Sequence, residues 1–440
     1  MLECIVTKFG GSSLANDEQF RKVRSILELE PTRRYLVPSA PGKRFKEDEK
    51  VTDLLYRCHR LAAEGKSIEP EFAKIRDRYL SIARGLHLSL DVEKELEQVE
   101  QGITGGKGAA WCASRGEYLC GRLMADYLGW KFLDAAEGVV FHDDGTLNDE
   151  KTQEKLSALL ADGASTVVPG FYGAREDGEV VTFSRGGSDI TGALVARAVH
   201  ADVYENWTDV FGFLMADPRI VDSPAEISSI TYKELRELSH MGASVLHEDA
   251  MFPVSRAGIP TNIRNTEKPY HPGTMISQNA PQEIYVPTIT GIAGHKGYSI
   301  ISVEKNMMNS EVGFGRKVLQ VLEEQGVSFE HMPTGIDSMC VVVSSESLAP
   351  HREEILKEIS QLVEGCGSVT VSDNLSIIAT VGRGMVHNCG TAARLFSAMS
   401  RARINVRMID QGSSELSIIV GVNDSDFEAT INAIYHEFVG

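Results

Sequence analysis

The chain has no long apolar run, no cysteine pair and no targeting segment. No stretch approaches the roughly 18 consecutive apolar residues of a membrane-spanning helix, and the amino end shows neither a basic-then-apolar signal nor an Arg/Ser-rich transit segment. The 7 cysteines form no CxxC pair and no ladder with histidine, which is typical of reduced thiols and argues against a disulfide framework or a protein-bound metal. We therefore expect a cytoplasmic protein without a membrane partner.

Positive charge is also scarce. The 62 acidic residues outnumber the 44 lysines and arginines and give a formal net charge of −18, which disfavours nucleic acid or an anionic membrane as the main partner. A small anionic substrate is still compatible with this charge if its site is locally basic. With 440 residues, of which 42% are hydrophobic and 24% charged, the chain is expected to form about two to four globular domains.

The chain opens with a buried strand and a glycine turn. Ile5–Phe9 is expected to be the strand, Gly10–Gly11 the turn, and Asp17 the N-cap of the helix that follows. Backbone without a Cβ can approach an anion closely and direct N–H groups at it, and Lys8 could follow a migrating phosphoryl group. An ordinary strand–turn–helix with a surface lysine would have the same pattern, and the segment lacks the ending of a Walker A loop.

Two further segments place charge at expected helix starts. Arg185 and two glycines precede a helix that begins at Ser188 and Asp189, so a guanidinium, free N–H groups and a helix dipole converge. Glu117 is expected in the first turn of a helix that opens at Ala113, where the dipole favours a carboxylate. Simple helix capping would also explain both carboxylates.

Strands alternate with helices as far as Arg264. This order predicts a mostly parallel sheet with helices on both faces, and the charged segment Lys43–Lys50 between the second strand and the next helix is expected to be a mobile, solvated loop. The loop Pro269–Gly273 is expected to lead out of the first domain. Further strands are expected at residues 131–134, 139–141, 165–169, 203–209 and 261–264.

The rest of the chain repeats itself at an offset of 77 residues. Ser299 corresponds to Ser376, Gly313 to Gly390, and residues 326–343 to 403–420 without a gap. Each copy reads as a ferredoxin-like βαββαβ unit. The second copy lacks its last strand, so the strand expected at 288–293 should cross over and complete it.

Five motifs occur in the order found in the aspartate kinases, and the chain resembles that family over essentially its whole length. The motifs are Lys8-Phe-Gly-Gly-Ser-Ser, Ser114-Arg-Gly-Glu117, Phe183-Ser-Arg-Gly-Gly-Ser-Asp189, Thr208-Asp209-Val and Asp217-Pro-Arg219. The repeat resembles the tandem ACT regulatory modules of the family. The resemblance implies an α/β protein with a three-layer αβα amino-acid-kinase domain at 1–282, a first ACT module at 295–373, and a second at 374–440 completed by strand 286–294.

The resemblance also implies the reaction and its residues. The reaction is ATP-dependent phosphorylation of the L-aspartate β-carboxylate, with Mg²⁺ on the ATP, at the start of the route to lysine, threonine and methionine. Catalytic roles fall on Lys8 and Asp189. The implied aspartate contacts are Thr52, Glu117 (at the ammonium), Arg185 (at the α-carboxylate) and Ser188. The implied ATP contacts are Lys8, Gly10, Gly11, Ser12, Thr208, Asp209, Leu214 and Arg219.

The chemistry is consistent with these roles. The attacking carboxylate is ionised at pH 7, so no general base is needed, whereas two approaching anions require fixed positive charge. Two departures from the family affect the nucleotide contacts: Ser244 replaces a lysine, and Phe213–Leu214 replaces an aromatic neighbour of adenine. The alternatives are a related kinase that acts on another carboxylate, such as glutamate, and a catalytically inactive amino-acid sensor.

The first ACT copy is expected to bind an inhibiting amino acid, and the two modules are expected to form a homodimer or larger homo-oligomer. The implied effector residues are Met308, Ser310, Gly313, Phe314, Ser328, Phe329 and Glu330. Glu330 suits a cationic side chain such as that of lysine, whereas threonine would need only hydroxyl partners, and Glu330 could also be a solvated strand residue. Arg407 takes its place in the second copy, so the copies should not bind one ligand equally.

Overall fold

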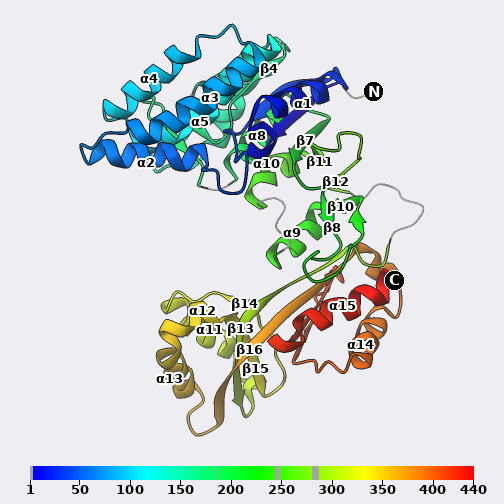
Figure 1. Cartoon of the computed structure of the whole chain (residues 1–440). Coiled ribbons are helices and arrows are strands. Elements are labelled where there is room, and N and C mark those ends of the chain that lie inside the picture. The colour runs from blue at the N-terminus through cyan, green and yellow to red at the C-terminus, as the bar shows by residue number, and fades with distance from the viewer. Residues whose placement is uncertain (1–2, 185, 243–247, 280–286) are drawn as a thin grey trace. The chain divides into compact units, whose positions relative to one another are not determined.

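The chain forms two units, each with its own main sheet (Figure 1). The computed structural model describes residues 3–184, 186–242, 248–279 and 287–440, with the side chains of 248–250 also outside the description. The first unit comprises Met1–Phe213, Ser228–Tyr232 and Val245–Pro281, and the second comprises Leu214–Ile227, Lys233–Ser244 and Gln282–Gly440. Residues 214–227 and 233–244, which precede the expected domain boundary at 282, therefore fold with the repeat.

The first unit contains an eight-stranded sheet in the order β10-β12-β11-β7-β1-β2-β4-β3. All neighbouring pairs are parallel except β11 and β12, which confirms the mostly parallel sheet. The strands are β1 (Ile5–Phe9), β2 (Arg33–Pro38), β3 (Lys131–Phe132), β4 (Thr166–Val167), β7 (Val203–Thr208), β10 (Ser229–Thr231), β11 (Thr261–Asn265) and β12 (Thr274–Ser277). β1 is central and fully buried, so residues at its carboxyl end are held by neighbours on both sides.

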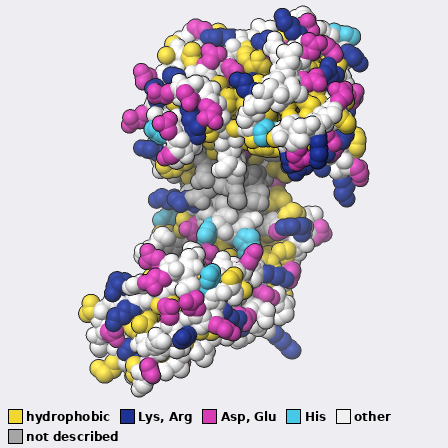
Figure 2. Space-filling model, turned by 90° about the vertical axis from the view of Figure 1, so that its left-hand side faces the viewer, with side chains coloured by type: hydrophobic (Ala, Val, Ile, Leu, Met, Phe, Trp, Pro, Cys, Tyr) yellow, Lys and Arg dark blue, Asp and Glu magenta, His cyan; other side chains and the backbone are white. Residues whose placement is uncertain are grey.

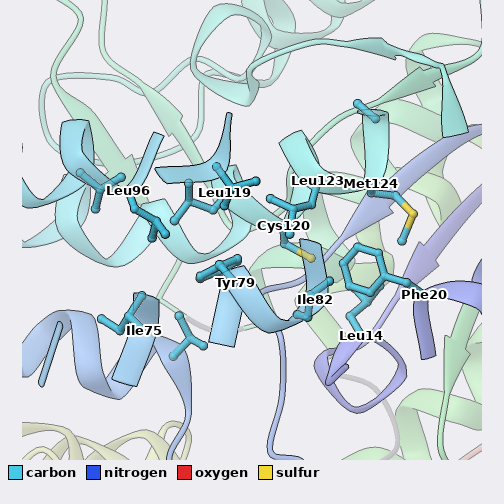
Figure 3. Close-up of a cluster of buried hydrophobic side chains, with 14 of the residues drawn as sticks. Leu14, Phe20, Ile75, Tyr79, Ile82, Leu96, Leu119, Cys120, Leu123 and Met124 are labelled. Carbon is cyan, nitrogen blue, oxygen red and sulfur yellow. The ribbon is translucent and has the colours of Figure 1, made fainter. Parts of the chain in front are cut away.

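Helices cover both faces of this sheet. They are α1 (Asp17–Glu28), α2 (Val51–Ala63), α3 (Glu69–Leu86), α4 (Val92–Thr104), α5 (Ala109–Leu128), α6 (Ala135–Gly138), α7 (Asp149–Leu159), α8 (Gly187–Ala198) and α10 (Glu248–Ala257). Phe9 joins the apolar core formed with α1 to α5, part of which Figure 3 shows around Tyr79, Leu119 and Phe20. Successive strand residues point to opposite faces, so Lys8 lies on the other face, where α8 packs on β1.

Several expected boundaries in this unit were wrong. The first helix is capped by Asn16, whose side chain accepts from the Gln19 N–H, and not by Asp17. Residues 139–141 form only isolated bridges, and the sheet continues past Arg264 into β12. The helix that carries Glu117 begins at Ala109, which puts this carboxylate in the third turn, beyond the reach of the N-terminal dipole. Two short hairpins complete the chain up to residue 227: β5 (Tyr172–Ala174) with β6 (Val180–Thr182), and β8 (Phe213–Leu214) with β9 (Glu226–Ile227).

The second unit is built on a six-stranded antiparallel sheet in the order β14-β15-β13-β16-β18-β17. Its strands are β13 (Gly291–Lys305), β14 (Phe329–His331), β15 (Ser338–Ser344), β16 (Gly367–Val381), β17 (Met408–Asp410) and β18 (Ser417–Asn423). Its helices are α9 (Tyr232–His240), α11 (Phe314–Glu324), α12 (Ser345–Leu348), α13 (Arg352–Leu362), α14 (Thr391–Arg401) and α15 (Phe427–Phe438). Each module has its own apolar core.

The two modules share their two longest strands. Residues 291–295 of β13 pair with 377–381 of β16, and 298–305 pair with both β15 and the first part of β16. Residues 291–295, which include part of the expected crossover strand, therefore pair in the second module and are continuous with the first strand of the first module. The repeat is visible in the helix starts: Gly313 and Gly390 cap α11 and α14 with φ of 85° and 87°, a conformation that favours glycine.

Helix α9 is fastened to the repeat by a buried carboxylate. Glu234 is fully buried and accepts hydrogen bonds from Thr290 Oγ1 at 2.6 Å and from the Arg383 backbone N–H at 2.9 Å. Its other oxygen pairs with the Arg383 guanidinium at 3.0 Å. Removing one partner of such a pair leaves a buried charge uncompensated, which typically costs about 3–5 kcal/mol. α9 is therefore held firmly in the second unit.

One face of the molecule shows how its charged side chains are distributed (Figure 2). Acidic and basic side chains are interspersed over the described part of the face in Figure 2, without a broad basic area. Among the described residues, no helix is both long and apolar enough to span a bilayer.

Candidate active site

Lys8 lies near the end of β1 and forms an ion pair with Asp189 of α8. Its Nζ is 2.6 Å from Asp189 Oδ1 and 3.4 Å from Asn206 Oδ1, and the Asn206 amide donates to the same Asp189 oxygen at 2.7 Å. Asn206 is the register partner of Lys8 on β7, so the sheet itself sets this contact. The Lys8 and Asp189 side chains are only 10% and 19% exposed. The ammonium is thus held in one place with its charge near the end of the sheet.

The glycine turn after β1 is pressed against the segment after β2. The Gly42 N–H donates to the Gly11 carbonyl at 2.7 Å. A Cβ on Gly11 would come within 2.8 Å of the Ala40 carbonyl oxygen, and one on Gly42 within 2.5 Å of the Gly11 carbonyl carbon. Both are backbone contacts that cannot give way by rotating a side chain. The glycines are therefore needed for close packing, and Gly10 keeps an ordinary φ of −70°.

A cavity of about 520 Å³ opens beside this turn within the first unit. Five of the predicted site residues line it: Gly11, Ser12, Thr52, Glu117 and Asp209. They come from the β1 turn, the first turn of α2, the middle of α5 and the end of β7. The remaining lining residues are Ala40, Pro41, Gly42, Lys43, Phe45, Lys46, Lys50 and Val51. The cavity thus joins the predicted phosphate turn and two of the predicted aspartate contacts, Thr52 and Glu117, in one space.

Glu117 is a buried carboxylate with an unused oxygen. Burial raises its pKa to about 8, against the opposing effect of hydrogen bonds from backbone N–H groups that include Ala40. Its Oε2 has no hydrogen-bond partner among the described residues. Gly116 lets α5 approach this closely, since a Cβ there would lie 2.9 Å from the Ala40 Cβ. A buried, under-bonded carboxylate in a cavity wall is suited to a cationic ligand group.

The structure places some predicted residues away from the cavity. Arg185 and Ser244 lie outside the described residues. Ser188 is buried against Gly170 and does not line the cavity. Leu214 and Arg219 belong to the second unit, where the exposed Arg219 pairs with Asp217 at 2.6 Å. Their roles stay predictions, as does that of Thr208, which donates to the cavity residue Asp209 at 3.1 Å.

The predicted effector residues lie in the first ACT module. Met308 and Phe314 are buried in its core, so their side chains serve packing. Ser310, Ser328 and Phe329 are exposed around the Gly313 turn and β14. Glu330 on β14 contacts His240 of α9, with Oε2 2.9 Å from Nε2. It is therefore not a merely solvated strand residue.

Comparison with known proteins identifies the family. The model of the amino acid kinase family matches residues 3–265, and the model of an ACT domain matches residues 378–438. Aspartokinase 3 of Bacillus subtilis (strain 168) is 38% identical over 98% of both chains. The chain belongs to the aspartokinases, the aspartate kinases of the amino acid kinase family. The crystal structure of Clostridium acetobutylicum aspartate kinase superposes with a TM-score of 0.91 at 48% identity, covering 99% of this chain and 100% of that one. The lysine-sensitive aspartokinase 3 of Escherichia coli (strain K12) is 26% identical over 99% of both.

Sequence reasoning missed two parts of this aspartokinase site. Only the strand register could have pointed to Asn206, because it follows Glu205 within a strand and has no glycine or arginine beside it in the sequence. Lys43, Phe45, Lys46 and Lys50 were expected in a solvated loop, yet they line the cavity. Their order along the chain does not show which way the loop folds.

The raised pKa of Glu117 predicts a pH-dependent stability. The folded protein keeps this proton up to about pH 8, whereas the ordinary pKa is 4.5. Between these two pKa values the folded state therefore binds more protons than the unfolded chain. The free energy of unfolding falls as pH rises from about 4.5 to about 8 and levels off above that. At 1.36 kcal/mol per pKa unit, the loss is about 2–3 kcal/mol between about pH 5.5 and pH 7.5. Thermal unfolding of the ligand-free protein should show that wild type loses stability relative to Glu117→Gln as pH rises. A constant difference between the two proteins would contradict the raised pKa.

Proposed function

We propose that this protein transfers the γ-phosphoryl group of Mg²⁺-ATP to the β-carboxylate of L-aspartate, giving 4-phospho-L-aspartate and ADP. The observation that carries the proposal is the unpartnered Oε2 of buried Glu117 in the same cavity as the glycine turn. A substrate with an ammonium at one end and a carboxylate at the other can satisfy Glu117 and present the carboxylate to phosphates on the turn.

The aspartate end is formed by α2 and α5. Glu117 receives the substrate ammonium, which offsets the cost of burying its charge and lowers its pKa. Thr52 lines the same wall and can donate its hydroxyl to a substrate oxygen. Arg185 and Ser188 are proposed for the α-carboxylate, by the family resemblance. The β-carboxylate is already ionised at neutral pH and attacks directly, so no general base is required.

The phosphate end is formed by the β1 turn. The backbone of Gly10, Gly11 and Ser12 can approach the phosphates closely and direct N–H groups at them. The Lys8 ammonium stabilises the negative charge that moves with the phosphoryl group during transfer. Asp189 and Asn206 hold Lys8 in place rather than contact the phosphates. Thr208, Asp209, Leu214 and Arg219 are proposed around the rest of the nucleotide. Bound Mg²⁺ would neutralise phosphate charge, and the Asp209 carboxylate in the cavity wall would offer it an oxygen ligand of the kind Mg²⁺ prefers.

The cellular setting follows from the same family. We place the reaction at the entry to lysine, threonine and methionine synthesis in the cytoplasm, with feedback control through the ACT modules and assembly of a homodimer through them. Support for lysine as effector comes from the name of the E. coli relative, lysine-sensitive aspartokinase 3, and from the acidic Glu330 in the first module.

A hydroxylamine trap for acyl phosphates tests the reaction and its substrate. Wild type should form hydroxamate from ATP and L-aspartate but not from ATP and L-glutamate, since the extra methylene moves the carboxylate away from the phosphates. Glu117→Gln should lose selectivity against analogues without the α-ammonium. Hydroxamate formed only with glutamate would show that the protein phosphorylates another amino acid. No product with either substrate would favour the alternative of a catalytically inactive sensor.

Replacing Lys8 with alanine tests the phosphate end. The variant should lose fixed charge that acts in the transition state, which lowers kcat by roughly 10²-fold or more. Lys22→Ala is the control, because this lysine is exposed on α1 and pairs with Glu267. A Lys8→Ala enzyme with full kcat and only a raised KM would show that Lys8 contributes to binding alone.

The effector site is tested by inhibition with lysine, threonine and both together. Lysine should inhibit wild type. The Glu330→Ala variant should require a lysine concentration at least about tenfold higher for the same inhibition, as expected for loss of a charge-assisted contact worth about 1.5–3 kcal/mol. Arg407→Ala at the corresponding position of the second module is the control. Equal inhibition of Glu330→Ala and wild type would show that the effector binds elsewhere. A wild type that is insensitive under all three conditions would contradict the proposed regulation.

A further inference from the structure

The segment Lys43–Lys50, here called the basic loop, brings three lysines to the cavity of an acidic protein. Lys43, Lys46 and Lys50 all line the cavity, whereas its only lining carboxylates are Glu117 and Asp209 among the described residues. Neither Lys46 nor Lys50 has a carboxylate partner in the described part of the chain. Lys43 Nζ donates to the Lys46 carbonyl oxygen at 3.4 Å. Among the residues that the structure describes, these three ammonium groups therefore form no ion pair.

Two of the three acidic residues of the basic loop, Asp48 and Glu49, pair with basic residues outside the cavity lining. Asp48 accepts from Arg78 of α3 at 2.5 Å and from the Arg44 backbone N–H at 2.9 Å. Burial alone would raise its pKa, but the hydrogen bonds from Arg44 and the charge of Arg78 hold the pKa of Asp48 at about 2. Glu49 pairs with Lys74 at 2.8 Å and with Arg57 at 2.7 Å. The carboxylates of Asp48 and Glu49 thus pair with α2 and α3, whereas the three lysines of the loop line the cavity.

The same arginine fixes the base of the loop on the glycine turn. Arg78 is 2% exposed and also donates to the Gly42 carbonyl at 2.5 Å. Gly42 in turn contacts Gly11 by a backbone hydrogen bond of 2.7 Å. Lys43 therefore follows directly on a residue that is in contact with the turn. An ordinary solvated loop would need neither a buried arginine nor a buried aspartate as an anchor.

We propose that Lys43, Lys46 and Lys50 bind the phosphates of the nucleotide and stabilise the transferring phosphoryl group, with Arg78 and Asp48 as positioning residues. The inference rests on the proposed phosphoryl transfer. Its physical basis is that the reaction brings a carboxylate to a polyphosphate, and three unpaired ammonium groups beside the glycine turn reduce the repulsion between them. The basic loop also explains how a chain of net charge −18 can hold two anions.

The test replaces the three lysines by glutamine, singly and together. The triple variant should show kcat/KM for Mg²⁺-ATP lowered by at least tenfold, and a smaller stabilisation of the protein by Mg²⁺-ADP in thermal unfolding. Because the contacts are electrostatic and solvent-accessible, the dependence of KM for ATP on salt should also become weaker than in wild type. Glu47→Gln, in the same loop but outside the cavity lining, and Lys66→Gln, in an exposed pair with Glu64, are the matched controls.

The outcomes separate this inference from the proposed function. A wild type that forms no hydroxamate overturns the function, whereas an active wild type with an unchanged triple variant overturns only the role of the lysines. An effect confined to KM for aspartate also overturns the assignment to phosphates. Asp48→Asn should lower the same parameters in wild type and add little in the triple variant, as expected of a residue that acts through the lysines. An equal additional loss in both backgrounds would make Asp48 merely structural.

Discussion

The hydrogen bond between the backbones of Gly42 and Gly11 is the constraint on which the rest of the site depends. It joins the segments that follow two adjacent parallel strands, β1 and β2, at a separation that no side chain allows. The first segment carries the proposed phosphate turn, and the second leads into the basic loop and then into α2. The carboxyl ends of these central strands meet at one edge of the sheet, which is where open α/β sheets bind their ligands. Fixing this one contact brings the phosphate turn, the loop lysines and Thr52 to a single cavity.

Charge in this site is balanced locally. Lys8 is neutralised by Asp189, whose oxygen is also held by Asn206, so the pair can respond to a phosphoryl group without leaving an isolated buried ion. Glu117 shows the opposite arrangement, because nothing described pairs with its Oε2 and its pKa is raised to about 8. A protein gains nothing in stability from such a carboxylate. Its position suits a cationic group of a ligand, and this is the basis for proposing the aspartate ammonium as its partner.

The sequence allowed the fold to be predicted well and the site in part. The strand-and-helix alternation and the 77-residue repeat follow from periodicity, and the crossover strand follows from counting elements in the second copy. The resemblance to the aspartate kinases implied Lys8 and Asp189, whereas Asn206 meets them only through the pairing of β1 with β7. Glu117 was assigned to a helix start because Ser-Arg-Gly-Glu has the appearance of a cap. The helix in fact begins at Ala109, and burial, which a single sequence does not display, controls its pKa.

The basic loop shows a second limit of the same kind. Its composition, with three lysines, three acids and an arginine, is typical of a solvated connection, and its lysines are indeed exposed. What distinguishes it is the buried Arg78, which lies 28 residues beyond the end of the loop on α3 and binds both Gly42 and Asp48. A contact of this kind depends on how α3 packs, which local pattern does not reveal.

The second unit shows the same reliance on distant partners. Glu330 is joined to His240 at the end of α9, and α9 is held in that unit by Glu234. The chain then continues to α10, which packs against α8, the helix that carries Asp189. If lysine binds at Glu330 as proposed, its ammonium competes with His240 for this carboxylate at the end of α9. Coupling between two sites requires an element whose equilibrium both ligands bias, and α9 is the element in contact with the proposed effector residue.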